Sequence, residues 1–188
     1  FLNDGAYISA STSGIGNAGN VDINVTGEVD FQNASPKAFN NRFAFSGVYS
    51  QVDFPGQGNA GNVTLRANSL KFREGAVIST GTYGNGDAGT VNVNVDAKAL
   101  FTGEIPSSLF GQVPFIFGSG IYSRVESTGF GNAGQINVTA GDLEVSKGAN
   151  LTTSTDGKGK ESLSTRAGDV TITVTGDVLF DGNGQFNP

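Results

Sequence analysis

The hexapeptide GNAGNV occupies residues 16–21 and returns unchanged at residues 58–63. Three looser copies follow further along the chain, at residues 86–91, 131–136 and 165–170. A segment that recurs at this spacing is typical of a repeat protein, in which each unit packs only against its neighbours. This repeat restricts the fold of the 188-residue chain more than any other feature of the sequence.

Each copy of the hexapeptide leads into a run in which apolar and polar residues alternate, such as VDINV at 21–25 and VTITV at 170–174. Alternation with a period of two indicates a strand with one buried face. Two further short strands follow in every unit. Because equivalent strands are separated by a whole unit, we expect them to pair in parallel. The inward positions of the third strand form an apolar column, Ile8/Val48/Ile78/Ile121/Leu151, and a column of small residues, Ala10/Ser50/Thr80/Ser123/Thr153.

The stacked units predict an all-β chain folded as a right-handed parallel β-helix, or β-solenoid, of about five rungs with three short strands each. We expect one such segment over residues 1–188. Glycine suits the sharp bend at each corner, and the side chains of Asn17, Asn59 and Asn132 are expected to hydrogen-bond along their column. The chain starts and stops inside a unit, so we interpret it as a segment of a longer repeat protein.

Two loop insertions rich in phenylalanine separate the second and third strands in alternate units, at residues 33–45 and 103–118. Because they occupy equivalent places, we expect them to project side by side from one flank. Two interpretations stay open: a lid packed back on the flank, or an exposed apolar patch that binds a partner. We favour the lid, since six exposed phenylalanines would promote aggregation. The candidate partner contacts are Phe39, Phe43, Phe45, Phe110, Phe115 and Phe117.

The composition excludes several kinds of chemistry. Without His or Cys the chain has no Ser-His-Asp or Cys-His catalysis and few means of binding a transition metal. Its formal net charge of −6 disfavours nucleic acid as a partner, and no apolar run is long enough to span a membrane. The acids nearest to the strands do not form a tight cluster. We therefore expect no enzyme activity and no catalytic, cofactor-binding or metal-binding residues.

The unit at residues 58–91, GNAGNVTLRANSLKFREGAVISTGTYGNGDAGTV, resembles the repeats of filamentous-haemagglutinin-like exoproteins, especially cyanobacterial ones of the two-partner-secretion type. The similarity extends over nearly the whole chain apart from the two insertions. It implies a right-handed parallel β-helix. It also implies export through an outer-membrane partner and a role in adhesion as a surface or secreted fibre.

From the repeat and the resemblance together, we expect a non-catalytic structural or adhesive segment of a large secreted or cell-surface β-helical exoprotein. Its place would be extracellular or on the outer cell surface. Its partners would be neighbouring units of the same parent chain, copies of itself, or surface glycans or proteins. Two alternatives stay open: a self-associating extracellular filament or matrix subunit, and a polysaccharide-active β-helix enzyme.

Overall fold

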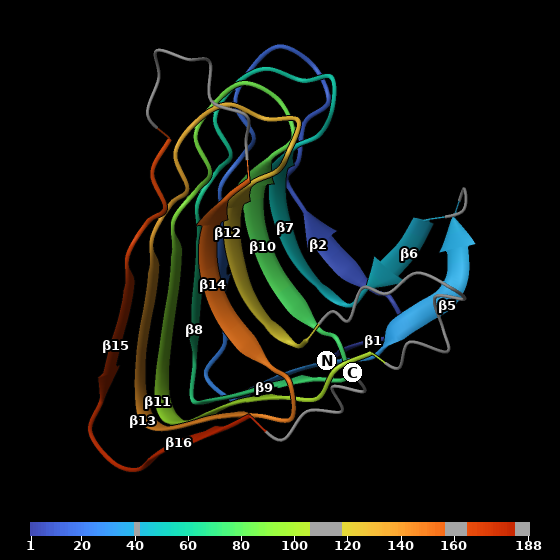
Figure 1. Cartoon of the computed structure of the whole chain (residues 1–188). Helices are drawn as coiled ribbons and strands as arrows, with labels where there is room; N and C mark the ends of the chain where they lie inside the picture. Colours follow the sequence, from blue (N-terminus) through green and yellow to red (C-terminus); the bar gives the residue numbers. More distant parts are fainter. Residues whose placement is uncertain (40–41, 106–117, 157–164, 183–188) are drawn as a thin grey trace.

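A computed structural model describes residues 1–39, 42–105, 118–156 and 165–182 of the chain, and this part contains strands and no helix. The strands form two parallel sheets and one antiparallel pair (Figure 1). The larger sheet holds β1 (Leu2–Asn3), β3 (Val21–Asn24), β4 (Glu28–Gln32), β8 (Val63–Ala67), β9 (Ser69–Arg73), β11 (Val91–Thr102), β13 (Ile136–Ser146), β15 (Val170–Val174) and β16 (Val178–Asp181).

The smaller parallel sheet consists of the third strand of each unit, and we call it the third-strand sheet. It holds β2 (Tyr7–Ser9), β7 (Gly47–Val52), β10 (Val77–Thr82), β12 (Gly120–Val125) and β14 (Asn150–Thr155). Figure 1 shows these strands stacked side by side, with strands of the larger sheet to the left of them and below them. This arrangement is consistent with the expected β-helix.

The strand register confirms the predicted columns. In the third-strand sheet, Ile8 pairs with Val48, Val48 with Ile78, Ile78 with Ile121 and Ile121 with Leu151. Every one of these pairs is parallel, and each joins one repeat unit to the next. The predicted pairing of equivalent strands across a whole unit is therefore correct.

Two units differ from the expected pattern of three separate short strands. In these units the first and second strands run together as the long strands β11 and β13. The register shifts between Val95 and Lys98, where β11 carries one residue more than β13. Gly141 lies opposite this bulge, and a Cβ there would come within 2.6 Å of the Ala97 carbonyl oxygen. A bulge with an opposing glycine lets two strands of unequal length share one register.

The core lies between the two parallel sheets and is filled by the inward columns. A ladder of aromatic rings runs through it, with Phe31 and Phe72 edge to face at 5.0 Å and Phe72 stacked on Phe101 at 5.4 Å. In the column of small residues, Ser50, Thr80 and Ser123 are fully buried, and their hydroxyls reach across the interior to the corners. Thr80 and Ser123 both donate to the Gly89 carbonyl oxygen at 2.8 Å. These bonds satisfy polar groups that are fully buried.

The corners are tight because consecutive units meet there backbone to backbone. A Cβ on Gly58 or Gly86 would lie 2.2 or 2.0 Å from the carbonyl oxygen of the corner glycine one unit earlier. Both residues also have a positive φ, of 141° and 146°, which glycine adopts without strain. The repeated glycines are therefore a backbone requirement, as the sequence predicted.

Polar side chains link the corners into a directional ladder. The Asn59 N–H donates to Asn17 Oδ1 at 2.9 Å, and the Asp87 N–H donates to Asn59 Oδ1 at 2.9 Å. The same bond continues from the N–H of Asn132 and then of Arg166. The expected bonding along this column is confirmed, but its main link runs from side chain to backbone rather than between side chains.

The first insertion folds into a β-hairpin of β5 (Ala34–Phe39) and β6 (Arg42–Phe45), which pair antiparallel. In Figure 1 this hairpin stands away from the stacked sheets, next to the start of β7. The ends of the second insertion also meet in an antiparallel bridge, between Glu104 and Gly118. Residues 106–117 lie outside the described part of the chain, so the expectation that both insertions project together stays a prediction.

Candidate contact surface

The outer side of the third-strand sheet carries three tyrosines, of which Tyr7 is exposed and Tyr122 is buried. We call Tyr7, Tyr49, Gln51, Tyr122 and Arg124 the tyrosine face. The Tyr7 and Tyr49 rings lie edge to face at 5.9 Å, and the Arg124 guanidinium sits 4.7 Å above the Tyr122 ring. Tyr7 keeps 60% of its surface exposed. Tyrosine and arginine are enriched in protein interfaces because they offer large rigid contacts with polar tips.

Two side chains of the tyrosine face are held by partners on the same sheet or next to it. Gln51 Nε2 donates to Ser79 Oγ at 2.8 Å, and Arg124 pairs with Glu126 at 3.2 Å. Ser79 is almost fully buried although it points outward, since the register places it between Tyr49 and Tyr122. The surface is therefore formed before any partner binds.

A clasp fixes the base of each insertion beside this face, and sequence reasoning missed it. The Tyr49 hydroxyl donates to the Phe45 carbonyl at 3.1 Å, and the Tyr122 hydroxyl donates to the Gly118 carbonyl at 2.6 Å. The signal was present in two related pentapeptides, SGVYS at 46–50 and SGIYS at 119–123. These occur only at the ends of the two insertions.

The serines that open these pentapeptides complete the clasp. Ser46 and Ser119 are fully buried. Their Oγ atoms accept from the N–H groups of Gly5 and Gly75 in the preceding units, at 3.0 and 2.9 Å. Ser119 also donates to the Thr102 carbonyl at 2.9 Å. Each insertion is thus anchored to its own unit and to the unit before it.

Burial governs the protonation of the two clasp tyrosines. Removal from water disfavours the phenolate and raises the pKa of Tyr49 well above its ordinary value. Burial raises the pKa of Tyr122 in the same direction, opposed by its hydrogen bond with Asn150 and by the Arg124 charge. Both hydroxyls therefore stay protonated and remain donors in the clasp.

Only part of the predicted set of phenylalanine contacts falls in the described structure. Phe45 is half-buried at the end of β6, one residue before the clasp serine. Phe39 and Phe43 lie on β5 and β6, with side chains outside the described part. Phe110, Phe115 and Phe117 lie outside it altogether. Their role as lid or partner contact stays a prediction.

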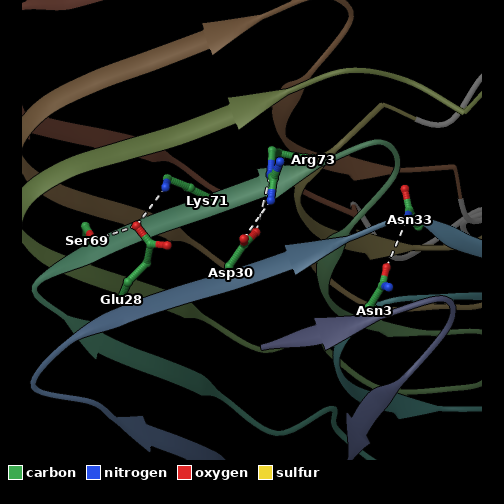
Figure 2. Close-up of polar contacts among 7 residues, drawn as sticks. All are labelled: Asn3, Glu28, Asp30, Asn33, Ser69, Lys71 and Arg73. Atoms are coloured by element: carbon green, nitrogen blue, oxygen red, sulfur yellow. Dashed lines mark hydrogen bonds and ion pairs between the residues drawn. The ribbon is translucent and has the colours of Figure 1, made fainter.

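The outer side of the larger sheet is a second polar surface, and its charges pair across strands (Figure 2). Arg73 contacts Asp30 through two hydrogen bonds of 2.6 and 3.3 Å, and Lys71 Nζ lies 2.8 Å from Glu28. The hydrogen bond from Lys71 holds the pKa of Glu28 below its ordinary value. These acids of the first unit are neutralised by bases of the second.

Two further acids on this surface are also held in ion pairs. Asp22 pairs with Arg66 at 3.2 Å, and Glu144 pairs with Lys98 at 2.7 Å. Within the described ranges no three acidic side chains come together as a metal site would require. No helix suited to crossing a membrane occurs in that part of the chain either.

Comparison of the chain with protein-family models, with curated proteins and with solved structures finds no match.

Proposed function

We propose that this chain is a non-catalytic structural and adhesive segment of a large secreted or cell-surface β-helical protein. In this proposal the parallel sheets close into a right-handed β-helix of about five rungs. The resemblance to filamentous-haemagglutinin-like exoproteins points the same way. The segment acts mechanically, because stacked units make a stiff body that holds surface side chains in fixed rows.

The observation that carries the proposal is the unbroken register of the third-strand sheet. Ile8, Val48, Ile78, Ile121 and Leu151 stand in one column, each pair joined by parallel strand hydrogen bonds. A stack of this kind resists bending because every unit is bonded to both neighbours. The described acids support the non-catalytic part, since Asp30 and Glu28 are held in ion pairs with bases of the next unit.

The tyrosine face supports the adhesive part. It combines an exposed aromatic residue, Tyr7, with the arginine Arg124 on a preformed sheet. A rigid aromatic surface binds a flat partner, such as a glycan or a protein surface, at low entropic cost. On the outer side of the larger sheet, Asp22 pairs with Arg66 and Glu144 pairs with Lys98, which favours solubility over binding there.

Adhesion can be tested with the 188-residue chain immobilised on beads. The binding of the beads to a panel of surface polysaccharides and to intact cells of the source organism would be measured. The Tyr7→Ser variant is expected to lose most of the binding. Ile15→Ser is the matched control, because Ile15 is an exposed apolar residue at a corner, away from the tyrosine face. Equal binding by both variants would remove the tyrosine face from the proposal.

The alternative of a polysaccharide-active enzyme is tested in the same panel. The chain would be incubated with each polysaccharide, and new reducing or unsaturated ends would be assayed. We expect none to appear. Chain-dependent release of such ends would contradict the non-catalytic role. Surface proteolysis of intact cells would test the location, since an outer-surface protein is cleaved before the cells lyse.

A further inference from the structure

An asparagine stands directly before a glycine where the chain enters the third corner, at Asn85–Gly86. We number the corners by the copies of the hexapeptide, so that the second, third and fourth corners are residues 57–63, 85–91 and 130–136. Parallel bridges join Gln57 to Asn85 and Asn85 to Phe130, one residue before the first glycine of each corner. Asparagine is a thermolabile residue, and a glycine after it leaves the next backbone nitrogen unhindered. Of these three bridged residues, Asn85 has the side chain that can close a five-membered ring with that nitrogen.

The reaction open to this pair needs no reactant other than water. The Gly86 backbone nitrogen attacks the Cγ atom of Asn85, and the Gly86 N–H proton leaves with the side-chain nitrogen as ammonia. The product is a cyclic imide. Water then opens the ring at one of its two carbonyl carbons and leaves aspartate or isoaspartate at position 85. Isoaspartate continues the chain through the former side chain, so it adds one atom to the backbone before Gly86.

The Asn85 side chain is accessible, but the peptide bond that must react is held on both sides. Asn85 is exposed, so water reaches its side chain and ammonia can leave. The Gly86 N–H donates to the Phe130 carbonyl at 2.8 Å, and the Asn85 carbonyl accepts from the Gly58 N–H at 2.8 Å. Because the nitrogen can attack only after it releases the Phe130 carbonyl, the reaction requires the fourth corner to separate from the third.

Close backbone packing keeps these corners together. A Cβ on Gly86 would lie 2.0 Å from the Gly58 carbonyl oxygen, and a Cβ on Gly131 would lie 2.0 Å from the Gly86 carbonyl oxygen. Phe130 is bonded to the third-corner segment twice, since its N–H donates to the Gly84 carbonyl at 3.0 Å and its carbonyl accepts from Gly86. Separation of the corners therefore breaks several backbone contacts at once.

We propose that Asn85 is a site of self-modification, which the stack prevents while the third and fourth corners are in contact and permits when they separate. In the separated state the pair reacts as it does in an unfolded chain. The observed rate is then the rate in the unfolded chain multiplied by the fraction of time that the corner is open. This inference rests on the backbone bonds of the corner and is independent of adhesion.

The modification makes the separation permanent. The extra backbone atom of isoaspartate lies between Gly84 and Gly86, so Phe130 can no longer keep its bonds to both residues. Either product also places a negative charge at position 85. Asp87, two residues further on, is an acid whose side chain accepts the Asn132 N–H at 2.7 Å. Modified chains are therefore expected to be less stable than unmodified ones.

The first test compares the folded 188-residue chain with the same chain unfolded in urea, at one mildly alkaline pH. Tryptic peptide 74–98 contains Asn85, and mass spectrometry follows the loss of ammonia and the formation of isoaspartate at this residue. The rate constant is expected to be at least about tenfold lower in the folded chain. Equal rate constants in the two samples would overturn the proposal.

Amide exchange at Gly86 measures the same opening without a substitution, because its proton exchanges only when the bond to the Phe130 carbonyl is broken. The slowing of the modification by folding should agree with the protection of this amide to within about tenfold. A modification that is faster than this limit would overturn the proposal, because Asn85 would then react in the closed corner.

A matched pair of variants tests the role of the fourth corner. Gly131→Ala places a methyl group against the Gly86 carbonyl and should speed the modification at least about threefold. Gly16→Ala is the control, because this equivalent glycine has nothing within 4 Å of its Cβ position. Circular dichroism shows that both variants are folded, and equal rates in the two folded variants would contradict the role of the contact.

The consequence for stability is tested with Asn85→Gln, since glutamine already holds the equivalent place at Gln57. Its side chain is longer by one carbon and does not form the five-membered ring. After prolonged incubation, the wild type is expected to show a lower urea midpoint, whereas Asn85→Gln should keep its own. Equal losses in both chains would show that the modification at Asn85 does not destabilise the stack.

Discussion

At the scale of single residues, the corner glycines give the clearest expectation, because two of them hold equivalent places and differ in what an added Cβ would meet. Gly89 and Gly19 hold the same place in their units, but only Gly89 lies against a carbonyl oxygen of a preceding unit. Gly89→Ala is expected to lower the free energy of unfolding by at least about 2 kcal/mol, because backbone must move to admit the methyl group. Gly19→Ala should leave it almost unchanged. Urea denaturation of both variants measures the difference.

An ion pair on the outer face gives a second expectation at this scale. The hydrogen bond from Lys98 holds the pKa of Glu144 below its ordinary value of 4.5. Lys98→Met should move this pKa up toward 4.5, while Lys98→Arg should keep it low. A carboxyl carbon NMR titration reads the pKa directly. An unchanged pKa in Lys98→Met would mean that Ser146 and Lys147 sustain the shift alone.

The sign of the pH dependence follows from the direction of this shift. A carboxyl group whose folded pKa is lowered stabilises the fold above its unfolded pKa. That contribution is lost as the pH falls through the folded pKa. Glu144 is therefore expected to favour the fold at neutral pH and to stop doing so in acid. Since the Lys98–Glu144 pair is partly exposed, the contribution is small.

At the scale of elements, the clasps decide how firmly each insertion is held. Tyr122→Phe removes the hydroxyl that donates to the Gly118 carbonyl at 2.6 Å. The variant is expected to lose about 1 kcal/mol of stability and to speed amide exchange at Ser119 and Gly120. Tyr7→Phe is the control, because Tyr7 lies largely exposed on the same sheet. Equal losses of stability in both variants would show that the hydrogen bond from the Tyr122 hydroxyl does not stabilise the fold.

The strands themselves could be predicted from the sequence, whereas the insertions could not. Alternation marks inward positions such as Val63, Val91 and Ile136, and the register confirms that they stack. In the first insertion, the antiparallel pairing of β5 with β6 has no counterpart in the repeated pattern of the other units. The clasp could have been found, since both SGxYS segments are visible. The acceptors of the two tyrosine hydroxyls could not be predicted, because they are backbone carbonyls, which every residue has.

The bulge in β11 shows why repeat alignment also has a limit. The alignment places Val91 and Phe101 in their correct columns. It does not reveal that residues 95–98 take up one extra residue within a continuous strand, opposite Gly141. The ends of a strand depend on its backbone hydrogen bonds. An alignment of side chains between repeat units does not predict those bonds directly.

At the scale of the whole molecule, stability is expected to vary along the stack. Each unit is stabilised by contacts with its neighbours, so units at an end lack one interface. β8 and β15 are matched, since both have five residues and occupy the same column. Among the described strands, β8 pairs on both sides and β15 on one. In dilute solution the amides of β15 should exchange with solvent at least about tenfold faster than those of β8.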